Sequence, residues 1–129
     1  MEETLGITIG ALKGIGKFNH VANYIHDGNV KRGFWEGERN TGELLMLVVS
    51  ELSEALEADR KGRHVDITKL EPGTYNFAET VKDTFEDEIA DAIIRLFDLC
   101  GAMGIDIQRH VTEKLDYNAS RPWKHGKQY

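Results

Sequence analysis

The stretch that most constrains the fold is Leu44–Glu57, whose composition and spacing predict one amphipathic helix. It contains neither glycine nor proline. At about 100° per residue, its apolar side chains cover one wide arc, and Glu51 falls inside that arc between Leu47 and Val48. Glu54 lies at the edge of the same arc. A carboxylate that faces a core needs a compensating cation, so we expect either a metal ion or a basic side chain beside Glu51.

The whole chain has the size and composition of one domain, covering residues 1–129. Its formal net charge of −6 argues against general nucleic-acid binding. The longest apolar run, Leu44–Val49, is too short to cross a membrane, and the first residues lack the pattern of a signal peptide. The single cysteine, Cys100, is typical of a reducing compartment. We therefore expect a cytoplasmic protein.

Hydrophobic periodicity predicts an all-α fold. The predicted helices cover residues 9–30 (firmest from Lys17), 41–61, 78–103 and 105–118. A linker at 63–77, with a short extended piece considered at 65–70, separates the second helix from the third, and a basic tail follows at 119–129. The third helix is apolar over more than one face, which favours a homo-oligomer.

Two acidic pairs share one spacing, because Glu88 and Asp91 are three residues apart, as Glu51 and Glu54 are. One interpretation of the charged arc on the third helix is a solvated face, with Asp91 paired to Arg95. The alternative is that antiparallel packing of the two helices converges four carboxylates. Such a hard oxygen site suits Mg²⁺, with Mn²⁺ as a substitute, and it suits metal-assisted cleavage of a phosphoanhydride.

The chain resembles the MazG-like all-α nucleoside triphosphate pyrophosphohydrolases, a superfamily that includes dimeric dUTPases and dCTP pyrophosphatases. The family motif EExxE, followed by ExxD, is similar to Ser50-Glu51-Leu52-Ser53-Glu54 and Glu88-Ile89-Ala90-Asp91, with Ser50 in place of the first glutamate. The resemblance spans about residues 33–129. It also includes Gly33-Phe34-Trp35, the run from Lys114 to Pro122, and Lys124-His125-Gly126-Lys127.

The resemblance implies a role for each matching residue. Glu51, Glu54, Glu88 and Asp91 would bind Mg²⁺ and be catalytic, because the metal that they hold activates water. Lys114 and Asn118, one helical turn apart, would face the phosphates and sugar of the nucleotide. Weaker phosphate candidates are Arg121 and Lys124. Trp35 either stacks on the base or, with Phe34, simply caps the core.

The implied reaction converts a (deoxy)nucleoside triphosphate and water into the monophosphate and pyrophosphate, which would cleanse or balance the nucleotide pool. The implied fold is a four-helix-bundle type whose core is completed in a homodimer or homotetramer. Two alternatives stay open. Ser50 is compatible with a helical interaction module that has lost catalysis, and a related hydrolase would act on another diphosphate-linked metabolite. The sequence also predicts that Glu51→Gln stabilises the metal-free protein. Lower stability of this variant would instead indicate that a basic side chain pairs with Glu51, and it would count against Glu51 as a metal ligand.

Overall fold

The computed structural model describes residues 3–4, 7–8 and 17–129, and the regular secondary structure of this part of the chain is almost entirely helical. Two two-residue strands, β1 (Glu3–Thr4) and β2 (Ile7–Thr8), form an antiparallel pair. The other elements are α2 (Phe18–Lys31), α3 (Thr41–Arg60), η1 (Ile67–Lys69), α4 (Phe77–Thr80), α5 (Phe85–Met103), α6 (Ile107–Ala119) and η2 (Trp123–Gly126). The all-α prediction is confirmed. Within the described ranges, no helix has both the length and the apolar character that a membrane span requires.

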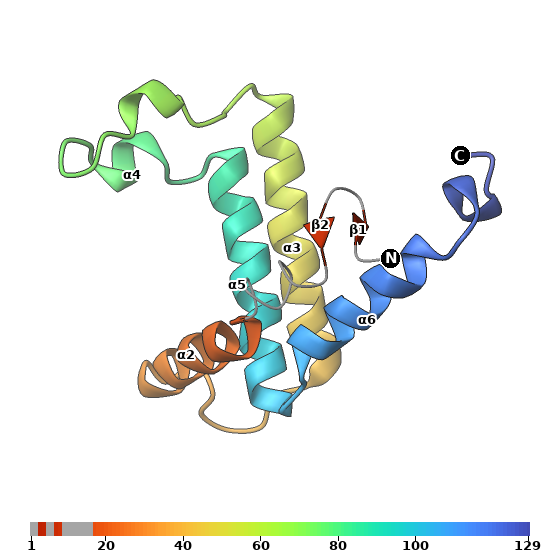
Figure 1. Ribbon diagram of the computed structural model, residues 1–129. Coiled ribbons are helices and arrows are strands. Elements are labelled where there is room, and N and C mark those ends of the chain that lie inside the picture. Colours follow the sequence, from red (N-terminus) through yellow and green to blue (C-terminus); the bar gives the residue numbers. More distant parts are fainter. Residues whose placement is uncertain (1–2, 5–6, 9–16) are drawn as a thin grey trace.

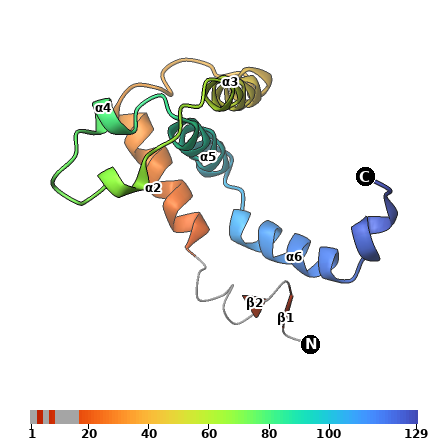
Figure 2. The same ribbon diagram turned by 90° about the horizontal axis from the view of Figure 1, so that it is seen from above.

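Helices α3 and α5 lie antiparallel and side by side, and α2 packs against α5 (Figures 1 and 2). The buried core between them is built mainly from small side chains: Ala22, Val48, Ala55, Ala58, Ala92, Leu99 and Cys100. Gly101 shows why the approach is close, since a Cβ atom there would lie 2.7 Å from the carbonyl oxygen of Ala22. Short core side chains bring the backbones together, so longer polar side chains on α3 and α5 meet across their contact.

Two local predictions are wrong: the start of the third helix and the conformation of the linker piece. A side-chain cap contributes to each difference. The third helix does not start at residue 78, because α4 ends at Thr80 and α5 starts only at Phe85. Thr84 caps α5, its Oγ1 accepting from the Asp87 backbone N–H at 3.3 Å. Within the piece considered extended at 65–70, Ile67–Lys69 form a 3₁₀ turn, and Asp66 caps it by accepting from the Thr68 N–H. The second helix matches α3, and the predicted start of the first helix at 9–16 lies outside the described residues.

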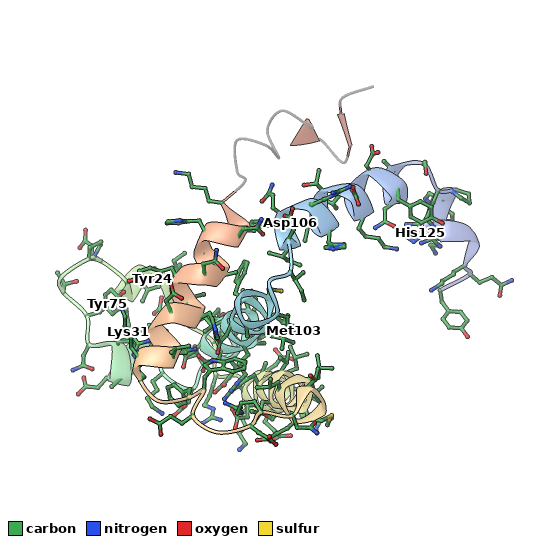
Figure 3. All side chains as sticks on the ribbon, turned by 90° about the horizontal axis from the view of Figure 1, so that it is seen from below. Tyr24, Lys31, Tyr75, Met103, Asp106 and His125 are labelled. Carbon is green, nitrogen blue, oxygen red and sulfur yellow. The ribbon has the colours of Figure 1, made fainter. Side chains whose placement is uncertain are left out.

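Helix α6 projects away from the α3–α5 pair (Figures 1 and 2). Its first turn is tied to α2, where Asn19 Nδ2 donates to Asp106 Oδ1 at 2.7 Å. Figure 3 shows Asp106 beside α2 and His125 at the distant end of the tail. The single chain therefore places three long helices together and a fourth apart, so the closed four-helix bundle and its completion by a second copy stay predictions.

Candidate functional site

The charged arc of α5 faces the neighbouring helices. It consists of Asp87, Glu88, Asp91, Arg95 and Asp98. Glu88 is buried, the three aspartates are half-buried, and Arg95 is exposed. The interpretation of this arc as a solvated face is therefore wrong for Glu88. The apolar side chains exposed on α5 are Ile93, Ile94, Leu96 and Met103.

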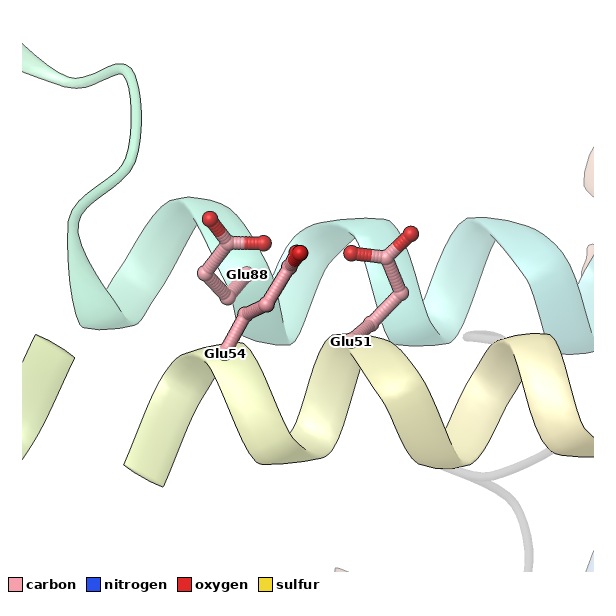
Figure 4. A group of neighbouring side chains, drawn as sticks. All are labelled: Glu51, Glu54 and Glu88. Carbon is pink, nitrogen blue, oxygen red and sulfur yellow. The ribbon is translucent and has the colours of Figure 1, made fainter. Parts of the chain in front are cut away.

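Three of the four predicted metal ligands converge. Glu51 and Glu54 on α3 and Glu88 on α5 each place a carboxylate oxygen within 4.8 Å of the other two (Figure 4). Glu51 is 7% exposed and Glu88 is 6% exposed, whereas Glu54 is exposed. We call these three residues the carboxylate cluster. Its burial sets it apart from an ordinary acidic surface, because buried carboxylates need compensation.

Asp91, the fourth predicted ligand, lies next to the carboxylate cluster and is not a member of it. Burial raises the pKa of Asp91, and the charges of Asp87 and Glu51 raise it further, whereas Arg95 lowers it. The side chain lines the pocket described below. Asp91 is therefore close enough to the carboxylate cluster to interact with it electrostatically. Its role as a direct metal ligand stays a prediction.

The two buried carboxylates have different partners. Arg95 Nε donates to Glu51 Oε1 at 2.6 Å. Burial alone would raise the pKa of Glu51, but the hydrogen bond and charge of Arg95 outweigh it and the net shift is downward. Arg95 forms an ion pair with Glu51, so the predicted Asp91–Arg95 pair is wrong. Of the two sources of compensation considered for Glu51, a basic side chain is present.

Glu88 has no such partner. Within the part of the chain that the structure describes, it forms no ion pair, and the carboxyl groups of Glu51 and Glu54 lie beside it. Burial, followed by these neighbouring carboxyls, raises the pKa of Glu88 to about 7. At neutral pH the cluster thus holds a proton or calls for a cation.

A pocket of about 450 Å³ lies beside Glu51. It is lined by Asn29, Phe34, Trp35, Arg39, Leu44, Leu47, Glu51, Asp91, Ile94, Arg95, Asp98 and Leu99. Trp35 Nε1 donates to Asp98 Oδ1 at 3.0 Å, and the Arg39 guanidinium lies 5.3 Å from the Trp35 ring centroid. The pocket thus combines an aromatic wall, two arginines and the edge of the carboxylate cluster.

The predicted phosphate-binding residues lie elsewhere. Lys114 and Asn118 are on α6, and Arg121 and Lys124 follow it. Lys114 and Arg121 lie over the ring of Tyr117, at 5.1 and 5.5 Å from its centroid. None of the four lines the described pocket beside Glu51, because α6 projects away from α3 and α5 (Figure 2).

Sequence reasoning missed Asp98, which fixes the wall of the pocket. Its carboxylate accepts hydrogen bonds from His26 Nδ1 and Asn29 Nδ2, each at 2.9 Å, and from the Trp35 indole. The available signal was its position seven residues after Asp91, which continues the inward stripe of α5. The contacts to α2 and Trp35 have no local sequence signal.

Comparisons of the chain with protein-family models, with curated proteins and with solved structures found no match.

Proposed function

We propose that this chain is a Mg²⁺-dependent nucleoside triphosphate pyrophosphohydrolase of the MazG-like type. The observation that carries the proposal is Glu88, a buried carboxylate that lies beside Glu51 and Glu54 and forms no ion pair among the described residues. Such a cluster is costly to maintain unless a ligand uses it. The motif resemblance then indicates which ligand and which reaction.

The donor set fits the proposed metal. Carboxylate oxygens from three residues lie close enough to share one cation, and Mg²⁺ prefers such hard ligands. Glu51, Glu54 and Glu88 would hold it, with Asp91 beside them. When bound, Mg²⁺ supplies charge neutralisation on the phosphates and a lowered pKa of water.

The protein's own residues supply binding and orientation. The pocket beside Glu51 is large enough for a base and sugar. Trp35 lies on the wall of this pocket, and its hydrogen bond to Asp98 sets the orientation of the indole. Arg39 and Arg95 are the basic side chains that line this pocket. Arg95 places positive charge next to the carboxylate cluster, and Arg39 places it beside Trp35, so both would be available to a bound triphosphate.

We further propose that the functional unit is a homodimer or homotetramer. On α3, four exposed apolar side chains repeat at spacings of four, three and four residues: Leu45, Val49, Leu52 and Leu56. We call this set the outer stripe of α3, and its spacing is typical of a seam that packs on another helix. Within one chain, α6 does not approach the carboxylate cluster. In an oligomer packed through this stripe, Lys114 and Asn118 of one copy could lie close to the carboxylate cluster of another.

Pyrophosphate release from a panel of triphosphates tests the proposal. Magnesium-dependent release of pyrophosphate is expected, with at least one substrate preferred. Glu51→Gln, Glu88→Gln and Asp91→Asn should each remove most of the activity. Glu43→Gln is the matched control, because Glu43 is an exposed acid in the first turn of α3 and is not a member of the carboxylate cluster. Undiminished release in excess chelator would overturn the metal-dependent mechanism.

The inactive interaction module is the second candidate, and the exposed outer stripe of α3 favours it. Ser50, the residue that motivated this candidate, argues against it. Ser50 is exposed, and its Oγ donates to the Leu47 carbonyl of its own helix at 2.7 Å. A change at this position leaves the carboxylate cluster intact. The same panel, extended to other diphosphate-linked metabolites, separates this module and the related hydrolase from the leading proposal.

A further inference from the structure

Arg95 occupies the boundary between the carboxylate cluster and the neighbouring pocket. It lies seven residues after Glu88 on the inward stripe of α5, so the two side chains share a helix face. Its Nε donates to Glu51 Oε1 at 2.6 Å, a short charge-assisted bond. The Glu51 side chain is 9% exposed and that of Arg95 is 41% exposed. The carboxylate is therefore enclosed, while the guanidinium extends toward the pocket.

The bond to Arg95 uses only one of the two oxygens of Glu51. Figure 4 shows one oxygen of Glu51 directed toward Glu54 and Glu88 and the other directed away from them. An Nε–H has a fixed direction in the plane of the guanidinium, so it restricts the carboxylate to one orientation. The oxygen that faces the cluster is thereby held in place before any ligand arrives.

We propose that Arg95 is a positioning residue for the metal centre, one that holds the Glu51 carboxylate in the orientation that directs one of its oxygens at Glu54 and Glu88. This inference rests on the proposed function, since it assumes that the cluster binds a divalent metal. Groups that hydrogen-bond to metal ligands typically contribute about 10–100-fold to metal affinity. The opposite possibility is that Arg95 competes with the metal for Glu51, in which case its removal tightens binding.

Calorimetric titration of the metal-free protein with magnesium chloride distinguishes these roles without measuring turnover. Arg95→Met is expected to weaken Mg²⁺ binding by about 10–100-fold. Arg95→Lys keeps the charge but loses the fixed Nε–H, so it should recover only part of the affinity. Arg60→Met is the matched control, because Arg60 pairs with Glu57 on the exposed face of α3 and should leave the affinity unchanged.

Circular dichroism of each variant establishes that it is folded before the titration. If Arg95→Met does not fold, the comparison rests on Arg95→Lys. Affinity that is unchanged or tighter in the folded Arg95 variants would overturn the positioning role while leaving the metal site in place. Absence of Mg²⁺ binding by the unsubstituted protein would overturn the proposed function as well. The two failures are therefore distinguishable.

Discussion

The three carboxylates of the cluster differ in what surrounds them. Glu51 pairs with Arg95, Glu54 is exposed to solvent, and Glu88 lies beside the other two acids and forms no ion pair among the described residues. The shared spacing of the pairs Glu51/Glu54 and Glu88/Asp91 predicted equal roles, but the environments of the three cluster carboxylates give unequal protonation. Glu88 is the group whose charge the fold tolerates least, because burial and two like charges act on it together.

Glu88→Gln should stabilise the metal-free protein at high pH. The pKa of Glu88 is raised to about 7 from 4.5, so between these values the folded state holds a proton that the unfolded state has released. Stability therefore falls as pH rises through this window. Thermal melts in chelator should show the amide more stable by on the order of 1–3 kcal/mol at pH 8, with little gain at pH 5.

Glu51→Gln provides the contrast in the same melts. The pKa of Glu51 is lowered by Arg95, so its ionised form favours the fold, and the amide should lower the melting temperature at pH 8. The sequence had predicted the opposite, that Glu51→Gln stabilises the metal-free protein. That prediction assumed that no basic side chain pairs with Glu51. Equal responses of the two variants would contradict the unequal environments.

For single residues, the sequence predicted which side chains are buried better than it predicted which side chains form ion pairs. The helical wheel placed Glu51 in an apolar arc, and the structure confirms that it is buried. The wheel paired Arg95 with Asp91 because a single helix shows only its own neighbours. The actual partner lies 44 residues away on α3, where packing alone determines the contact.

Among the elements, α5 does most to organise the site, since α3 packs against it on one side and α2 on the other. Its length and apolar character were predictable, but its start at Phe85 depends on the cap at Thr84. Its inward polar stripe was not predictable from periodicity, which assigns charged arcs to solvent. The small core side chains and Gly101 are what allow that stripe to meet α2 and α3 closely.

Asp98→Ala should release the aromatic wall of the pocket. The carboxylate accepts bonds from His26, Asn29 and Trp35, and losing it leaves donors without an acceptor, at a cost of about 1–3 kcal/mol each where they are buried. Because the chain has two tryptophans, the Trp123→Phe background isolates Trp35. Red-shifted emission and stronger acrylamide quenching are expected.

The matched control for this change is Asp116→Ala, an exposed acid on α6. It should leave the emission of Trp35 unchanged in the same background. An Asp98→Ala spectrum identical to that of the control would show that Asp98 does not hold the indole in place.

The whole molecule leaves more apolar surface on its long helices than a closed bundle would. The outer stripe of α3 and the exposed side chains Ile93, Ile94 and Leu96 on α5 have no cover within the described part of the chain. Meanwhile α6 carries the predicted phosphate-binding residues away from the carboxylate cluster (Figure 1). Both features are compatible with the proposed homo-oligomer, in which another copy would complete the site.

Light scattering at micromolar concentration should therefore give a mass of a dimer or larger. Leu52→Lys, in the outer stripe of α3, should shift that mass toward the monomer, because a charge in a helix seam is costly. Ser53→Lys is the neighbouring exposed control outside the stripe. A monomeric mass for the unsubstituted protein would contradict the assembly.

The location of a bound divalent ion tests the central claim most directly. Crystals grown with Mn²⁺ should show an anomalous difference peak between the carboxylates of Glu51, Glu54 and Glu88. The structure also contains a competing group, Asp83, Asp87 and Glu88, whose carboxylate oxygens also lie within 4.8 Å of one another, with Asp83 exposed. A peak at that second group alone, or no peak at either group at millimolar Mn²⁺, would contradict the account.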